Sequence, residues 1–253
     1  MQYTSPRFVL AVFCSVSALL LGSCSISFGL RQRVLSQREC IECDLKGIDF
    51  SSEDLSGVSL VYSDLSGANF SNANLTGAKL SSPPSLFGSG TTRLTGANLS
   101  NANLTDTTFE GSVLEGANLT GANLTNANLL SANLNGAILR NATFSGARIG
   151  DPRRVSMMGA DLSGTNLSNL DLSQLLLKDA NLTGANLQGA KLRYAGMYNA
   201  NLTGANLNGT DFTGATLGRA NLTNASLNTA IICETTLPSG EYSFRDCPEK
   251  SPW

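Results

Sequence analysis

The stretch LEGANLTGANLTNANLLSANLNGAIL, residues 114–139, decides the fold. Leucine returns in it at every fifth position, and four of these leucines follow an Ala-Asn pair. A period of five fits neither the 3.6-residue period of an α-helix nor the two-residue period of a strand. Each unit offers a single apolar side chain, which becomes buried only if successive turns of chain stack on one another. The stretch is therefore one part of a stacked repeat.

The five-residue register continues on both sides of this stretch. Apolar residues occupy it over 45–80, 94–149 and 157–237, giving 37 central positions that are all Leu, Phe, Ile or Met. Residues 81–93, with Pro83-Pro84, and residues 150–156 break the register. We therefore expect one repeat domain over residues 40–237, with loops extruded at 81–93 and 150–156.

The units follow the pattern A(D/N)LXX, so the chain resembles the pentapeptide-repeat family over roughly four fifths of its length. The resemblance implies an all-β fold, a right-handed quadrilateral β-helix with four pentapeptides per square coil. The central residue and the Ala two places before it would point inward. Thirty-seven units then make about nine coils and, at about 4.8 Å per coil, a rod roughly 45 Å long. Leu170 and Leu175 replace the inner Ala, which predicts a widened or distorted coil.

The N-terminal region has the layout of an export signal. Residues 8–21 form an apolar run that follows Arg7 and is too short to span a bilayer. Leu21-Gly22-Ser23-Cys24 resembles the lipobox of bacterial lipoproteins, in which the cysteine becomes the lipidated first residue. We expect residues 1–23 to be a signal peptide and Cys24 to anchor the chain to a membrane facing the periplasm. The alternative is an ordinary secretory signal, which leaves the chain soluble in the periplasm or in a thylakoid lumen.

Both ends of a stacked repeat need covering, because the terminal coils expose unpaired backbone groups. We expect residues 24–39 to provide a tether, 25–30, and a short capping helix, 31–39. Residues 238–253 would form the C-terminal cap.

Four cysteines remain after the signal peptide and the lipidation site are set aside. Cys40 and Cys43 lie at the first coil, whereas Cys233 and Cys247 lie at the last. A disulfide needs Cα atoms within about 7 Å, so pairing across the rod is excluded. The expected disulfides are Cys40–Cys43 and Cys233–Cys247, as an oxidising compartment favours. Redox catalysis or half a metal site remains an alternative for the Cys-x-x-Cys pair.

One side of the third repeat block carries candidate residues for binding a partner. Positions twenty apart stack, which aligns Met158, Lys178 and Tyr198 on one outward ladder. An apolar and aromatic patch rimmed by arginine is typical of a protein interface, although scattered exposed residues would give the same pattern. The candidate patch comprises Arg153, Arg154, Met158, Leu176, Tyr194 and Tyr198.

The composition argues against most chemistry. The chain has no histidine, the commonest general base and metal ligand, and its net charge is −2. We expect no enzyme activity, cofactor, metal site, small-molecule substrate or nucleic-acid partner. Asp44 and Asp64 would stack as a crude cation site, with solvated surface as the alternative. The expected function is a structural or interaction rod with an unknown protein partner. A DNA-mimic inhibitor of gyrase is the alternative, disfavoured because a duplex carries one charge per about 1.7 Å.

Overall fold

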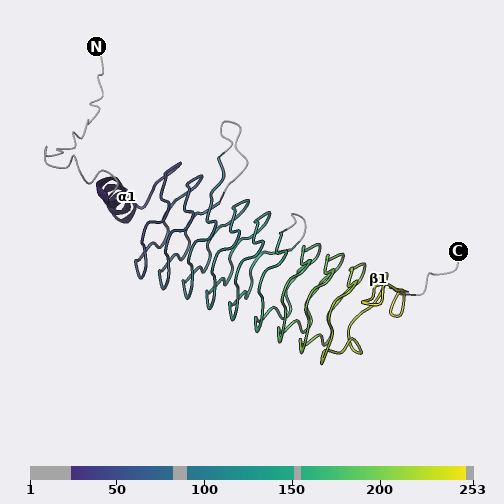
Figure 1. The fold of residues 1–253 in the computed structure, drawn as a ribbon. Helices are drawn as coiled ribbons and strands as arrows, with labels where there is room; N and C mark the ends of the chain where they lie inside the picture. Colours follow the sequence, from purple (N-terminus) through teal and green to yellow (C-terminus); the bar gives the residue numbers. More distant parts are fainter. Residues whose placement is uncertain (1–23, 82–89, 151–154, 249–253) are drawn as a thin grey trace, which may run out of the picture.

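The computed structural model describes residues 24–81, 90–150 and 155–248 of the 253-residue chain. It is a right-handed quadrilateral β-helix, drawn as an elongated stack of square coils in Figure 1. Helix α1 (Cys24–Gln37) lies at one end, and strands β1 (Thr235–Thr236) and β2 (Tyr242–Ser243) form an antiparallel pair at the other. The predicted fold class is therefore confirmed. The expected signal peptide, residues 1–23, lies outside the described residues.

Parallel bridges between residues twenty apart, such as Asn98 and Asn118, join each coil to the next. Around this position the Leu119 N–H donates to the Ile138 carbonyl at 2.7 Å, and the Asn118 N–H donates to the Ala97 carbonyl at 2.9 Å. Each side of a coil therefore bonds to the coil before it and to the coil after it. Together these bonds satisfy the backbone groups that would otherwise be buried without partners.

The core is built from the central side chains and the small residues two places before them. Leu119 and Leu124 have no exposed surface, and neither does Ala122 between them. Identical positions stack from coil to coil, as the rings of Phe50 and Phe70 do with centroids 5.3 Å apart. The register read from the sequence therefore identifies the buried residues, because the twenty-residue coil returns each central side chain to the same column.

Hydroxyl groups replace Ala at several inner positions without being left unpaired. The buried Thr107 hydroxyl donates to the Leu75 carbonyl at 2.8 Å, and the buried Ser112 hydroxyl donates to the Phe109 carbonyl at 2.6 Å. A hydrogen bond of this kind offsets the cost of burying the hydroxyl.

Each coil turns at corners whose backbone has a positive φ. Gly121 has a φ of 67°, and a Cβ placed there would lie 2.4 Å from the Asn101 side-chain oxygen of the preceding coil. Glycine adopts this left-handed backbone without strain, and at this corner the space taken by Asn101 leaves no room for a Cβ.

Both interruptions are shorter than the sequence suggested. Thr92 is fully buried two places before Leu94, and Arg93 bridges to Asp64, so the coil resumes before residue 94. Val155 is likewise buried, and Ser156 bridges to Asn133. The predicted loop ends at 93 and 156 are therefore wrong. Thr92 and Val155 fill inner positions that Ala usually takes, so the sequence pattern did not show where each of these units begins.

The N-terminal cap also differs from the prediction. Helix α1 includes the segment 25–30 that was expected to be a tether, and it ends at Gln37 rather than at residue 39. It ends there because Arg38 adopts a φ of 56°, while Glu39 already bridges to Ser59 of the second coil. Val34 is fully buried against the core. No helix within the described residues is long and apolar enough to cross a membrane.

Side chains cover the backbone groups of both terminal coils. At the N-terminal end, Arg31 Nε donates to the Asp49 carbonyl at 2.7 Å, and Arg38 donates to the Asp54 carbonyl. At the other end, the Asp246 carboxylate accepts a hydrogen bond from the Ile232 N–H at 2.8 Å. These contacts replace the neighbouring coil that each end lacks.

The C-terminal cap follows the last coil, whose Thr236 still bridges to Thr216 of the coil before it. Its antiparallel pair joins β1, which still belongs to the last coil, to β2. Arg245 reaches back and donates to the carbonyls of Leu227 and Ala230. The cap thus closes the coil that contains Leu227, which is only partly buried.

Leu124→Ala tests the role of the stacked core. Removing this fully buried side chain should lower the free energy of unfolding by about 2–5 kcal/mol, because the coils leave a cavity between rigid neighbours. Urea denaturation followed by circular dichroism measures the loss. Thr125→Ala is the control, since it removes an outward hydroxyl that bonds to Asn123 and should cost about 1 kcal/mol. Equal losses in the two variants would contradict the burial of Leu124.

Candidate functional site

Most outward positions carry short polar side chains that satisfy one another. Asn118 Oδ1 accepts hydrogen bonds from the Thr120 backbone N–H at 3.1 Å and from its hydroxyl at 2.7 Å. Between coils, the Asn98 amide donates to Asn69 Oδ1 at 3.1 Å. The sides of the rod are therefore largely neutral and self-bonded. Exposed apolar side chains on such a surface are the first candidates for a functional site.

The structure brings together three of the six residues predicted for the partner patch. Met158 and Tyr198 are 40% and 41% exposed, and both directly follow central residues on one side of the rod. Lys178 takes the position between them, twenty residues from each, whereas the partly buried Leu176 lies on the neighbouring ladder that runs from Ser156 to Gly196. Arg153 and Arg154 lie outside the described residues.

An arginine that the sequence reasoning missed borders Tyr198. The guanidinium carbon of Arg219 lies 5.6 Å from the centre of the Tyr198 ring, within range of a cation–π contact. The ring also covers Gly218, where a Cβ would come within 3.1 Å of it. Because 219 is one coil plus one residue beyond 198, the stacking rule places the two residues close together, but it does not decide which way the Arg219 side chain turns.

Tyr194 lies at a corner next to this ladder and points elsewhere. Its ring covers Gly214 of the following coil, where a Cβ would lie 2.3 Å from a ring carbon. It is 61% exposed and borders a cavity of 590 Å³ beside the C-terminal cap, together with Phe244. Tyr194 therefore belongs to a second surface, separate from Met158 and Leu176.

Several outward carboxylates are already neutralised by basic side chains. Arg193 Nε lies 2.5 Å from Asp211 Oδ2, and Arg140 Nε lies 2.5 Å from Asp161 Oδ2. Burial acts to raise the pKa of Asp211, but hydrogen bonds from Thr213 and Arg193 outweigh it and keep that pKa below its ordinary value. These pairs hold adjacent coils together and leave little unbalanced charge on the rod.

Asp44 and Asp64 stack as the twenty-residue period predicts, but a side chain supplies the cation. Lys46 Nζ lies 3.5 Å from Asp44 Oδ2 and 3.3 Å from Asp64 Oδ2. The hydrogen bond to Asp64 and the charges of both carboxylates raise the pKa of Lys46. Across the described part of the chain, no group of three or more His, Cys, Asp or Glu side chains could hold a metal ion.

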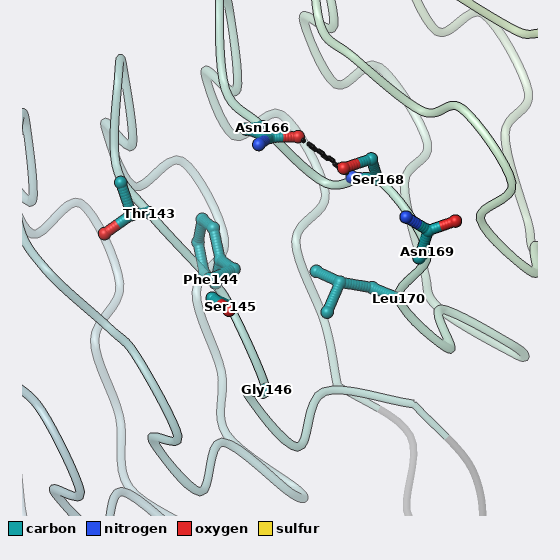
Figure 2. A pocket seen from close by; sticks show the side chains of 8 residues that line it. All are labelled: Thr143, Phe144, Ser145, Gly146, Asn166, Ser168, Asn169 and Leu170. Carbon is teal, nitrogen blue, oxygen red and sulfur yellow. Dashed lines mark hydrogen bonds between the residues drawn. The ribbon is translucent and has the colours of Figure 1, made fainter.

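A cavity of 440 Å³ separates two coils beside the second interruption, and Figure 2 shows its lining. Most central N–H groups bond to the next coil, as Leu139 does to Asp161 at 2.7 Å, but within the described residues Phe144 does not bond to Asn166, and Ile149 and Leu207 also lack such a bond. Leu170, which replaces an inner Ala, lies at this opening and confirms the predicted distortion. The lining residues carry no ionisable side chain: Thr143, Phe144, Ser145, Gly146, Asn166, Ser168, Asn169 and Leu170.

The four cysteines pair as predicted. Cys40 and Cys43 form a disulfide with Cα atoms 5.7 Å apart, and Cys233 and Cys247 form another with Cα atoms 4.7 Å apart. The first lies within the initial coil, where Cys40 fills the central position before Leu45. The second ties the C-terminal cap to the last coil.

The repeats also match a known family. A family model described as pentapeptide repeats matches eight copies over residues 54–82, 92–129, 117–150, 156–193 and 195–232, and these ranges cover most of the stacked coils. This chain belongs to the pentapeptide-repeat family. No curated protein matches it.

Solved structures of several pentapeptide-repeat proteins are similar to this one. HetL from the cyanobacterium Nostoc sp. strain PCC 7120, involved in heterocyst differentiation regulation, is 30% identical with a TM-score of 0.37, over 85% of this chain and 97% of that chain. Trypsin-treated QnrB1, a plasmid-mediated fluoroquinolone resistance protein, is 19% identical with a TM-score of 0.45, over 79% and 90%. A protein of the Arabidopsis thaliana thylakoid lumen is 27% identical with a TM-score of 0.15, over 58% and 70%.

The double variant Cys233→Ser, Cys247→Ser tests how the pentapeptide-repeat rod is closed. Opening a loop with a sequence separation of 14 should cost about 3 kcal/mol and expose Arg245 to trypsin. Thermal unfolding and limited proteolysis measure the two effects. The matched control is Cys40→Ser, Cys43→Ser, which opens a separation of only 3 and should leave cleavage at Arg245 unchanged. Unchanged proteolysis in the first variant would mean that the disulfide does not hold the cap.

Proposed function

We propose that this chain is a non-catalytic, exported rod that is anchored to a membrane by lipid on Cys24 and binds another protein through one side. The observation that carries the proposal is the exposure of Met158 and Tyr198 on one ladder, on either side of Lys178, on a surface made mostly of short polar side chains. We define the lateral patch as Met158, Leu176, Tyr198 and Arg219. Arg153 and Arg154 extend it in the proposal through their place in the sequence, just before the ladder.

The chemistry of the lateral patch fits recognition of a protein. Tyrosine and arginine are enriched among the residues that dominate binding energy at interfaces. Tyr198 offers an exposed ring already ordered by Gly218 beneath it and Arg219 beside it, so little side-chain entropy is lost on binding. Met158 adds a flexible apolar side chain that adapts to a partner surface.

The place of Cys24 supports an anchoring role for the N-terminal end. It is the first residue of α1, which lies at one end of the rod (Figure 1). Acyl chains on this cysteine would hold that end at the membrane, since each buried CH₂ contributes about 0.8 kcal/mol. The opposite end would then project into the periplasm. The alternative remains a soluble form in the periplasm or a thylakoid lumen.

Binding of a protein is favoured over catalysis and over mimicry of a nucleic acid. The chain has no histidine, and we assign it no catalytic residue, cofactor or small-molecule substrate. A duplex mimic needs a dense array of free negative charge, whereas Asp161 and Asp211 are paired with arginines and the net charge is only −2.

Cys24→Ser tests the anchor. In a bacterial host, the unchanged chain should sediment with membranes and accumulate as a precursor when globomycin blocks lipoprotein processing. The variant should remain an unprocessed precursor that carries no acyl chain, because it has no thiol to acylate. Cell fractionation and immunoblotting measure both effects, and Cys14→Ser is the control because it keeps Cys24. A soluble unchanged chain, or processing of Cys24→Ser to the mature size, would rule out the anchor.

Tyr198→Asp tests the lateral patch. The change removes the exposed ring and replaces it with a strongly hydrated charge, so recovery of the partner should fall at least about tenfold. Affinity purification from the native host with quantitative mass spectrometry measures the change. Ile138→Asp is the control, since Ile138 is 37% exposed on the neighbouring side of the rod. Equal recovery with both variants would remove the lateral patch from the proposal.

A further inference from the structure

A second surface lies at the C-terminal end of the rod, and none of its lining residues belongs to the lateral patch. It is a cavity of 590 Å³ where the last coils meet the cap, in the yellow region of Figure 1. We call it the end groove. Its lining includes Tyr194, Thr213, Cys233, Glu234, Phe244 and Cys247.

One corner column of the β-helix builds the first wall of the end groove. Tyr194, Gly214 and Glu234 follow one another at intervals of twenty, and all have a positive φ. Gly214 leaves a gap in the column, and the Tyr194 ring lies across it. The ring is therefore held against the coil while 61% of its residue surface stays exposed.

The cap also contributes to the lining. Phe244 directly follows β2 and is 61% exposed, with its ring edge-on to Tyr242 at 5.0 Å between centroids. The Cys233–Cys247 disulfide and the bond from the Asp246 N–H to the Ile232 carbonyl, 3.0 Å, hold this segment against the last coil. Two aromatic residues from distant parts of the chain thus line one cavity, together with both cysteines of the disulfide.

The end groove has an unbalanced negative charge. Glu234 is exposed at its rim, and no cation pairs with it among residues 24–81, 90–150 and 155–248. The nearby arginines are already engaged, Arg193 by Asp211 and Arg245 by Asp246. Aromatic faces also carry partial negative charge, so rings and carboxylate favour the same kind of ligand.

We propose that the end groove binds an arginine or lysine side chain presented by a partner protein. The aliphatic part of that side chain would pack between Tyr194 and Phe244, while its charged group meets Glu234. The inference rests on the proposed function only in taking the occupant to be another protein. It places a second contact on the rod, at the end opposite α1.

Titration with small probes tests the end groove without knowledge of the partner. The full chain, with its disulfides oxidised, is titrated with N-acetyl-arginine methylamide while NMR follows the ring signals of Tyr194 and Phe244. The matched probe is N-acetyl-citrulline methylamide, which has nearly the same shape but no charge. The arginine probe should cause saturable shifts of both rings and weaken as salt rises, whereas the citrulline probe should bind at least about tenfold more weakly. Equal binding of the two probes, or no saturable shift, would overturn the proposal.

Two variants locate the binding. Glu234→Gln should weaken the arginine probe about threefold, whereas Glu115→Gln removes an exposed carboxylate from a regular coil and should have no effect. Tyr194→Ala should abolish the saturable shift of Phe244. Equal effects of the two Glu variants would mean that the probe senses only overall charge, which contradicts the proposal.

The outcomes also separate this inference from the proposed function. If Tyr198→Asp loses the partner but the unchanged chain does not bind the arginine probe, only the end-groove proposal is overturned. If the unchanged chain binds the arginine probe but Tyr198→Asp still recovers the partner in full, only the lateral patch is overturned. Sedimentation that shows a dimer lost in Glu234→Gln would make the occupant a second copy of this chain, and so overturn the assignment to another protein.

Discussion

The whole structure depends on the stacking of one coil on the next. A single coil has one apolar residue per side and cannot bury it alone, whereas twenty-residue stacking places Leu119 and its equivalents in continuous columns. The same stacking lets Leu119 and Asn118 bond to the coils on either side. Hydrophobic burial and backbone hydrogen bonding therefore arise together, and a change that disrupts one also disrupts the other.

This constraint explains where the rod is irregular. Beside the second interruption, Leu170 occupies an inner position that regular coils give to Ala, and the Phe144 side of the coil opens into a cavity. The two ends of the rod also depart from the regular pattern, since each terminal coil lacks a neighbouring coil on one side. Arg31 and Arg38 at one end, and Arg245 and Asp246 at the other, bond to the backbone groups that would otherwise have no partner.

The regularity also shapes what the surface can recognise. Asn and Thr side chains bond to their own turns and neighbouring coils, so most of each side is committed to the rod itself. The residues left to bind a partner are therefore the few that depart from the repeat consensus. Tyr198 on one side and Tyr194 at the end both lie over a glycine of the next coil, which fixes each ring while leaving it exposed.

The sequence alone determined the coil, its buried residues and its disulfides, because a strict period of five dictates which side chains share a column and which cysteines lie close. It also predicted that Met158 and Tyr198 would align. Only the tertiary structure decided that Thr92 and Val155 belong to coils, that Arg219 borders Tyr198, and that Tyr194 faces the cap. These features depend on where an irregular segment folds back and which way a long side chain turns, and no periodic rule governs either.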